Sequence, residues 1–323
     1  FASAASEFKE AYNPTKVMEI GSNDGVFIKN FNPTTTIAVE PCSNFAEITN
    51  KKGYRTFPKF WNTELSKKIL NEHGKQDLIF SANCMCHIQD LDDAFTAIKT
   101  LLADEGVFVF EDPALDKMIE RNSYDQIYDE HAHIFSVIAL KNILERNGLE
   151  IFHVANLSVH GGSNRIYVKH KNNNKIFPTI DVDLNLQKEQ EMGLESFNTY
   201  VKFGEKVKQS KFDLVNLLDT LKKQGKKIVS YGATSKSTTV FNYCGISTDH
   251  IDYIVDTTPH KQGKLAPGSH IPVIAPERGF DSSVDVAYLG AWNYKEEILK
   301  KEVNFIEKGG YFITHVPMVQ VIK

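Results

Sequence analysis

The sequence predicts an α/β protein made of two successive blocks of alternating strands and helices. Short apolar runs repeatedly end in glycine-rich or polar turns, after which apolar residues return at helical spacing. The same alternation begins again after a polar and helical stretch in the middle of the chain. This order is typical of mostly parallel sheets whose faces are covered by helices. We therefore expect two α/β domains in succession, with no internal repeat beyond this shared rhythm.

The first block contains six apolar runs of strand length. Residues 91–102 and 139–147 lie between such runs and have helical spacing, and Gly148 is the kind of residue that commonly follows the end of a helix. The expected strands are residues 17–20, 36–40, 77–82, 107–111, 149–156 and 164–170.

The second block follows a connection of different composition. Residues 171–185 are polar and predict a loop or linker. Residues 186–224 carry apolar side chains at helical spacing, which predicts one long helix or two. The strands expected after this connection are residues 227–231, 251–255, 284–289 and 311–315.

Composition excludes several classes of protein. The chain has 323 residues, of which 41% are hydrophobic, so it can bury the cores of two domains. Its formal charge of −4 and pI near 6.3 predict no basic surface for nucleic acid or an anionic membrane. No apolar run approaches the roughly 18 residues of a membrane helix, and residues 1–6 do not resemble a signal peptide. We expect a cytoplasmic protein, and its oligomeric state is not predicted.

The four cysteines form no pattern associated with disulfides or zinc. Cys84 and Cys86 have His87 next to them, but no second pair of ligands accompanies them. Cys42 and Cys244 stand alone in the sequence. Buried, reduced thiols are therefore the expected state, and no metal site is expected.

A glycine-containing turn follows the first expected strand, and a carboxylate ends the next strand. Such turns stand at the carboxyl edge of a parallel sheet, where folds of this kind bind ligands. Glycines let the backbone approach a ligand without a Cβ clash, and Glu40 can accept hydrogen bonds from both hydroxyls of a ribose. The residues expected to bind a cofactor are Glu19, Gly21, Asn23, Asp24, Gly25, Glu40 and Pro41, with Ala82 and Asn83 at the end of another strand.

The acidic residues of this turn favour S-adenosylmethionine as its ligand. Glu19 and Asp24 would repel a pyrophosphate but suit a sulfonium and an ammonium group. The turn also lacks the G-x-G-x-x-G order that presents a helix N-terminus to phosphates. Glu40 alone would suit NAD as well. A dinucleotide site and an ordinary glycine-containing turn are therefore the alternatives.

Side chains capable of acid–base chemistry gather in two further segments. Residues 81–87 follow one expected strand, and residues 128–133 place a phenol, two carboxylates and two imidazoles within six residues. A general base that deprotonates carbon needs a pKa near neutrality, which histidine supplies, and a tyrosine can donate to a developing oxyanion. A cluster of exposed polar residues that caps the next helix is the alternative. The candidate catalytic residues are His131, Tyr128, Glu130 and His87.

Three further segments could bind the charged part of a substrate. Residues 160–165 place adjacent glycines between two expected strands, which permits a hairpin or the close approach of a ligand. Residues 232–236 could cradle a phosphate, and residues 261–263 could form a basic loop over a ligand. Each of the three can equally be an ordinary turn. The candidate substrate-binding residues are His160, Gly161, Arg165, Lys236 and Lys261.

Taken together, these motifs resemble the sugar C-methyltransferases of unusual deoxysugar biosynthesis. The cofactor turn alone is weak evidence, but the motifs from Tyr231 to Pro272 are characteristic of that family, and the similarity covers nearly the whole chain. The residues that carry the resemblance are 19–25, Ala82-Asn83, His87, 128–131, Phe135-Ser136, 160–165, Tyr231-Gly232-Ala233, Lys236, 242–246, Val255-Asp256, Pro259, 261–263, Pro267-Gly268, 270–272 and Ala291-Trp292-Asn293.

The resemblance implies a domain order, a cofactor and a substrate. It implies a Rossmann-like S-adenosylmethionine-dependent methyltransferase domain at residues 1–170 and a linker with a helical connection at 171–224. A second Rossmann-like domain at 225–323 would then bind a nucleotide sugar. The implied reaction is methyl transfer to a carbon, expected to be C-3, of a nucleotide-linked 4-keto-deoxysugar.

The implied reaction passes through an enolate. The 4-keto group acidifies the proton on C-3, and His131 would remove it. Tyr128 or His87 would stabilise the enolate oxygen, while Glu130 would orient the imidazole or hold a sugar hydroxyl. An O- or N-methyltransferase acting on a sugar or small metabolite is one alternative, and a non-catalytic subunit that binds S-adenosylmethionine is another.

One feature usual in the family is missing from these residues. Members usually begin with a cysteine-rich zinc-binding domain that contributes to the sugar site, and nothing like it occurs here. Either the natural polypeptide is longer, or this branch does without that domain.

Overall fold

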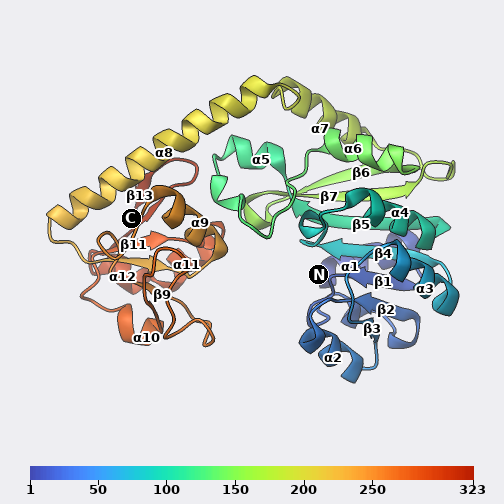
Figure 1. Ribbon diagram of the computed structural model, residues 1–323, viewed down its shortest axis with the longest axis horizontal. Coiled ribbons are helices and arrows are strands. Elements are labelled where there is room, and N and C mark those ends of the chain that lie inside the picture. Colours follow the sequence, from blue (N-terminus) through green and yellow to red (C-terminus); the bar gives the residue numbers. More distant parts are fainter. The chain divides into compact units, whose positions relative to one another are not determined.

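The computed structural model describes residues 1–323, and the chain divides into two compact units (Figure 1). The first unit consists of Phe1–Leu115 and Ala132–Leu194. The second consists of Asp116–His131 and Glu195–Lys323. The expected boundaries at residues 170 and 225 are therefore not those of the structure, because residues 171–194 pack in the first unit and a short segment from the first half of the chain packs in the second.

The first unit contains a seven-stranded sheet in the order β3-β2-β1-β4-β5-β7-β6. Neighbouring strands are parallel except β7, which pairs antiparallel with both β5 and β6. The expected mostly parallel α/β fold is confirmed, and only the three-residue strand β3 was not predicted. The strands are β1 (Val17–Ile20), β2 (Thr36–Val39), β3 (Arg55–Phe57), β4 (Gln76–Ala82), β5 (Leu102–Pro113), β6 (Leu149–Leu157) and β7 (Ser163–His170).

Two apolar cores lie on opposite faces of this sheet. Neighbouring residues of a strand point to opposite faces, so Ile79 belongs to one core while Leu78 and Phe80 belong to the other. Helix α1 (Ala2–Tyr12) covers the second core through Phe8, whose ring centroid lies 5.6 Å from that of Phe80. The first core is covered by α3 (Thr63–His73), α4 (Leu91–Leu101) and α6 (Val137–Arg146), and α2 (Ser43–Lys51) lies between β2 and β3 in the chain.

Helix α7 (Ile180–Glu191) packs in the first unit, where the carboxylate of its residue Glu189 contacts α6. Glu189 accepts hydrogen bonds from the backbone amides of Val137 and Ile138 at 2.7 and 2.9 Å. These amides belong to the first turn of α6, where the helix itself offers them no acceptor and its dipole favours a negative charge. The prediction of a loop at 171–185 is therefore wrong from residue 180 onward, because this polar helix is stabilised by a long-range contact that has no signal in its own sequence.

The segment Asp116–His131 belongs to the second unit although it lies between two strands of the first sheet in the chain. The hydroxyl of Tyr124 lies 3.8 Å from Sγ of Cys244, a residue 120 positions away. The carboxylate of Asp125 accepts a hydrogen bond from the indole of Trp292, 167 positions away. The segment contains most of α5 (Leu115–Glu120) and the 3-10 turn η4 (Tyr124–Gln126).

The second unit contains a six-stranded sheet in the order β10-β9-β8-β11-β12-β13. Its strands are parallel except β13 at the edge, which runs antiparallel to β12. The four expected strands are present, and the two missed ones have only two and three residues. The strands are β8 (Ile228–Tyr231), β9 (Tyr253–Val255), β10 (Val273–Ile274), β11 (Val286–Leu289), β12 (Tyr311–Thr314) and β13 (Gln320–Ile322), and the helices are α8 (Phe197–Lys223), α9 (Ser235–Cys244), α10 (Pro276–Gly279), α11 (Lys295–Lys301) and α12 (Val303–Glu307).

Two further expectations can be compared with the structure. None of the helices combines the length and the apolar character that crossing a membrane requires. All four cysteines are free; Cys86 and Cys244 are buried and Cys84 is partly buried, but Cys42 is exposed. The expectation of buried thiols is therefore wrong for Cys42, because this residue precedes α2 in the loop at the edge of the sheet.

Candidate active site

The two sheets carry the same turn at the carboxyl end of their first strand. In the first unit the amide of Gly21 donates to the carbonyl of Val39 at 2.8 Å, and in the second unit the amide of Gly232 donates to the carbonyl of Val255 at 2.9 Å. In each sheet this first strand lies where the strand order reverses, and such folds bind ligands in the crevice at that point. Each unit therefore has a candidate ligand site of its own.

In the first unit, the turn after β1 is fastened to Glu40 at the end of β2. One carboxylate oxygen of Glu40 accepts from the amide of Asn23 and the other from the amide of Cys42, both at 2.8 Å. The carboxylate is thereby held in one orientation, and each oxygen keeps a further lone pair that could accept from a hydroxyl. Gly21 has a φ of +74°, and a Cβ there would lie 2.8 Å from Sγ of Cys84. Only glycine allows this close approach.

Glu19 is a buried carboxyl group at the carboxyl end of β1 in the first-unit site. Its side chain is only 4% exposed, and its Oε2 has no hydrogen-bond partner. Burial raises the pKa of Glu19 well above its ordinary value, a hydrogen bond with the Ile28 backbone lowers it, and the nearby Glu40 and Asp24 carboxylates raise it further. A cation placed here would relieve both the burial cost and the repulsion between carboxylates. The site therefore fits a ligand with a ribose and a positive charge, and it does not fit a pyrophosphate.

The other residues predicted to bind the cofactor lie at the same edge of the first sheet. The amide of Asn83 donates to the carbonyl of Glu111 at 2.7 Å, which ties the end of β4 to β5. The amide of Asp24 donates to Oδ1 of Asn23 at 2.7 Å and so closes the turn after β1. The structure brings together Glu19, Gly21, Asn23, Asp24, Gly25, Glu40, Pro41, Ala82 and Asn83 at the carboxyl ends of β1, β2 and β4.

Asp112 was not among the predicted site residues, although it ends β5 at the same edge. It is 3% exposed, and burial raises its pKa to about 7; contacts with Cys86 lower the pKa, and the charge of Glu111 raises it. One carboxylate oxygen is 3.4 Å from the amide of Cys86, and the other has no partner. In the sequence, only its position could have indicated a role: Asp112 directly follows the expected strand at residues 107–111, at the edge of the sheet where ligands bind.

Four residues predicted for catalysis or substrate binding also lie in the first unit. His87 ends the 3-10 turn η3 (Met85–His87) after β4. His160 and Gly161 stand in the hairpin between β6 and β7, where both have positive φ. Arg165 donates to Glu111 at 2.6 Å and to Glu7 at 2.8 Å, so its guanidinium is engaged by two carboxylates. All four residues therefore belong to the first unit.

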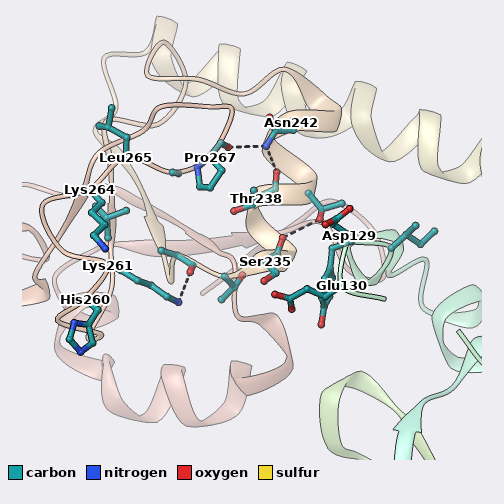
Figure 2. A pocket seen from close by; sticks show the side chains of 17 residues that line it. Asp129, Glu130, Ser235, Thr238, Asn242, His260, Lys261, Lys264, Leu265 and Pro267 are labelled. Carbon is teal, nitrogen blue, oxygen red and sulfur yellow. Dashed lines mark hydrogen bonds between the residues drawn. The ribbon is translucent and has the colours of Figure 1, made fainter. Parts of the chain in front are cut away.

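The second unit contains a pocket of about 730 Å³ at the carboxyl end of β8. Figure 2 shows the carboxylates of Asp129 and Glu130 on one side and the side chains of His260, Lys261 and Lys264 on the other. We call it the second-unit pocket. Its lining consists of Ile127, Tyr128, Asp129, Glu130, Ala233, Thr234, Ser235, Thr238, Thr239, Asn242, His260, Lys261, Lys264, Leu265, Ala266, Pro267 and Val273.

Tyr128 lies between His131 and Lys236, and we call these three residues together with Glu130 the acid–base cluster. Its ring centroid lies 4.0 Å from that of His131, and Nζ of Lys236 lies over the same ring at 5.6 Å. Nδ1 of His131 lies 2.8 Å from the carbonyl oxygen of Gln126. Because a carbonyl can only accept, this contact requires the proton of a neutral imidazole to be on Nδ1, which leaves Nε2 as the basic nitrogen. The structure therefore groups Tyr128, Glu130, His131, Lys236 and Lys261 in one unit.

The basic side of the pocket is formed by the loop after β9. Lys261 donates to the carbonyl of Ala233 at 2.7 Å, and its Nζ lies 3.7 Å from a carboxylate oxygen of Asp256. The loop that follows approaches α9 closely, since Asn242 donates to the carbonyl of Pro267 at 3.0 Å (Figure 2). A Cβ at Gly268 would lie 1.8 Å from Oδ1 of Asn242. This wall of the pocket was missed by sequence reasoning except for Lys261, because it consists of polar and small residues from two separate segments.

Comparison with known proteins matches both halves of the chain to methyltransferases. Residues 3–154 match the model of a methyltransferase domain, and residues 158–317 match that of a C-methyltransferase C-terminal domain. The chain is 32% identical over 309 residues to the C-methyltransferase NovU of Streptomyces niveus, covering 95% of this chain and 73% of that protein.

Solved structures similar to part of the chain include further methyltransferases. One is an S-adenosylmethionine-dependent methyltransferase from Clostridium acetobutylicum, with a TM-score of 0.42, 15% identity, and coverage of 52% of this chain and 90% of that one. Another is the O-methyltransferase of a trans-AT polyketide synthase multienzyme from Brevibacillus brevis in complex with S-adenosyl-L-homocysteine, with a TM-score of 0.42, 14% identity, and coverage of 59% of this chain and 78% of that one.

Proposed function

The chain belongs to the C-methyltransferase family and is an S-adenosylmethionine-dependent C-methyltransferase; from this premise we propose that its acceptor is C-3 of a nucleotide-linked 4-keto-deoxysugar. The first unit would hold the methyl donor, and the second-unit pocket would hold the nucleotide sugar. Members of this family are named as enzymes that methylate carbon. This name disfavours two alternatives, O- or N-methylation and a subunit without catalytic activity.

The observation that carries this proposal is the division of charge in the second-unit pocket. A nucleotide sugar has an anionic pyrophosphate at one end and a neutral keto sugar at the other. Lys261 and Lys264 lie on one side of the pocket, whereas Glu130 lies on the other. Tyr128 also lines the pocket. Lysines suit the pyrophosphate. The phenol can donate to the carbonyl oxygen of the sugar, and the carboxylate can accept from a sugar hydroxyl. The volume of about 730 Å³ is within the range of small-molecule pockets.

His131 would act as the base through Nε2. The contact of its Nδ1 with the Gln126 carbonyl fixes both the tautomer and the ring orientation, as a base requires. The Tyr128 ring packs against the imidazole and limits its rotation. The proton of C-3 would pass to Nε2, and the electron pair of the broken C–H bond would move toward the 4-keto oxygen, which becomes the enolate oxygen.

Tyr128 would donate its hydroxyl proton in a hydrogen bond to the enolate oxygen. A donor aimed at the atom on which charge develops lowers the barrier more than it strengthens ground-state binding. Glu130 would hold a sugar hydroxyl or orient the imidazole. His87 remains a second candidate donor from the first unit.

In the first unit, Glu40 would accept from the ribose hydroxyls of the cofactor, and Glu19 and Asp24 would face its cationic part. S-adenosylmethionine, when bound, supplies a methyl group made electrophilic by the attached sulfonium. The partnerless buried Oε2 of Glu19 and the fixed carboxylate of Glu40 support this assignment. The task of the protein is then to place the acceptor carbon in line with that methyl group.

Mass spectrometry after incubation with S-adenosylmethionine and a dTDP-4-keto-2,6-dideoxysugar tests the proposal. We expect a gain of one methyl group, and in deuterated water without cofactor we expect deuterium to enter the same carbon. Methylation of an oxygen or nitrogen, or methylation without any exchange at C-3, would contradict it.

A further inference from the structure

Asp125 is a fully buried carboxylate directly beside the acid–base cluster. It lies in η4, three positions before Tyr128, and it is 0% exposed. Burying a carboxylate is strongly unfavourable unless other groups compensate the charge. Asp125 also lies close in the chain to Tyr128 and His131, the residues that the proposed reaction uses.

The partners of Asp125 come from distant parts of the second unit. Its Oδ2 accepts a 2.6 Å hydrogen bond from Nε1 of Trp292 and lies 3.6 Å from Nε2 of His315. The other nitrogen of His315 is 2.9 Å from the hydroxyl of Tyr288. Burial acts to raise the pKa of Asp125, but His315, Trp292 and the charge of Lys236 together hold it below the ordinary value. The carboxylate is therefore an anion at neutral pH, and it joins η4 to the loop after β11 and to the residue that follows β12.

The same carboxylate acts on the environment of Tyr128. The ammonium of Lys236 lies over the Tyr128 ring, 5.6 Å from its centroid. Burial lowers the pKa of Lys236, and the charge of Asp125 counteracts that lowering. A charged ammonium binds an aromatic face, whereas a neutral amine binds it only weakly. Asp125 thus helps to keep Lys236 in the protonated form that holds the phenol ring.

The backbone gives a second route from Asp125 to the base. The next residue, Gln126, is also fully buried, and its carbonyl is the group that holds Nδ1 of His131. The amide of His131 in turn donates to the carbonyl of Tyr128 at 2.9 Å. Residues 125–131 therefore form a short segment with internal hydrogen bonds. Asp125 fixes its first residue, and Tyr128 and His131 lie together near its end.

We propose that Asp125 is a positioning residue for proton abstraction: its buried carboxylate fixes the segment 125–131 to the second unit, and thereby sets the tautomer of His131 and the orientation of Tyr128. This inference rests on the proposed function for its chemical meaning. Its structural content, the control of the His131 tautomer by Asp125, can be measured without substrate.

The experiment compares Asp125→Asn with the full-length parent protein. The asparagine keeps the size of the side chain and an oxygen for Trp292, but it removes the negative charge. Asp252→Asn is the matched control, since Asp252 is a second-unit carboxylate that binds Lys222 at 3.0 Å and the Ile228 amide at 2.9 Å and does not line the pocket. Nitrogen-15 spectra of labelled histidine, with the His131 signals assigned by their loss in His131→Asn, report the tautomer.

In the parent and in Asp252→Asn, we expect the Nδ1–H form of neutral His131 to dominate. In Asp125→Asn we expect a mixture of both tautomers and at least tenfold faster amide hydrogen exchange in residues 125–131, with the first unit unchanged. Deuterium exchange at C-3 of the sugar should fall at least tenfold in Asp125→Asn only. An unchanged tautomer and unchanged amide exchange in Asp125→Asn would overturn the inference. Absence of sugar exchange in the parent itself would instead contradict the proposed function.

Discussion

Glu40 and Asp256 occupy equivalent positions in the two sheets of the chain. Each stands after the second strand of its sheet and accepts a 2.8 Å hydrogen bond from an amide of the turn after the first strand, Asn23 for Glu40 and Ala233 for Asp256. The two sites differ in charge, because Nζ of Lys261 lies 3.7 Å from Asp256 while no cation lies within ion-pair distance of Glu40. Glu40 is therefore available to hydroxyl groups, whereas the second site presents an ammonium.

This difference predicts opposite results for two matched substitutions. Glu40→Gln should weaken binding of S-adenosylhomocysteine about 10- to 100-fold, because a charge-assisted hydrogen bond contributes roughly 1.5–3 kcal/mol. Asp256→Asn should leave that affinity within about twofold, since it lies in the other unit. Isothermal titration calorimetry measures both, and equal affinities for the parent and Glu40→Gln would contradict the assignment of the ribose site.

Lys261 should affect the other ligand. Lys261→Met should weaken binding of dTDP about tenfold and should reduce its dependence on salt concentration, because one ammonium no longer pairs with the pyrophosphate. Lys300→Met is the control, since Lys300 is an exposed residue of α11 that does not line the pocket. Titration calorimetry at two ionic strengths measures both effects. If the two variants bound dTDP equally well, the lysine side of the pocket would not be the pyrophosphate site.

His131→Asn should abolish the exchange of the proton on C-3 of the keto sugar with solvent. Loss of a general base typically costs about 10²- to 10⁴-fold in rate. His133→Asn is a closely matched control, because His133 is two positions away but its Nε2 contacts the carbonyl of Gln89 in the first unit. Deuterium incorporation followed by mass spectrometry measures both variants. Exchange at the parent rate in His131→Asn would assign the base to another residue.

Gly21→Ala should destabilise the first unit more than a glycine substitution of the same backbone conformation elsewhere. Gly21 and Gly225 have φ values of +74° and +73°, but a Cβ would meet Cys84 only at Gly21 and would meet nothing within 4 Å at Gly225. The left-handed conformation costs an alanine roughly 1–2 kcal/mol in both, and the clash adds about 1–3 kcal/mol in Gly21→Ala alone. Chemical unfolding of the two variants measures the difference. Equal destabilisation would mean that Cys84 moves aside freely.

The stability of the protein should depend on pH through Asp112. Burial raises the pKa of Asp112 from 3.8 to about 7 in the folded state, so the folded state binds this proton more tightly than the unfolded chain does. The resulting destabilisation is absent below about pH 4, grows between about pH 4 and 7, and is complete above that. Asp112→Asn removes it, so the variant should gain stability relative to the parent as pH rises from 5 to 8, by roughly 2–4 kcal/mol.

A carboxylate with the opposite shift provides the control for Asp112. Burial acts to raise the pKa of Asp77, but hydrogen bonds from Thr15 and Lys16 outweigh it and lower the pKa. Asp77 therefore stabilises the fold throughout this pH range, and Asp77→Asn should lower the unfolding temperature by a similar amount at pH 5 and pH 8. Scanning calorimetry of both variants across this range is the measurement. A pH-independent difference for Asp112→Asn would show that Asp112 ionises normally.

The α/β class and ten of the thirteen strands could be predicted from the sequence, and the cofactor turn is a prediction of the same kind. These features are local: an apolar run predicts a buried strand, and glycines with Glu19 and Glu40 at the ends of successive strands must meet at one edge of a parallel sheet. The three missed strands have two or three residues each, too few for a periodic pattern.

The residues that surround the acid–base cluster could not be predicted from the sequence, because they come from distant parts of the chain. Asp125 meets Trp292 across 167 positions and Glu189 meets α6 across about 50, and neither contact has a signal in its own stretch of sequence. For that reason the order of the chain predicts the first domain for the segment Asp116–His131, although it packs in the second unit. The order of elements along the chain determines topology, but burial of a polar residue depends on partners that folding brings from far away.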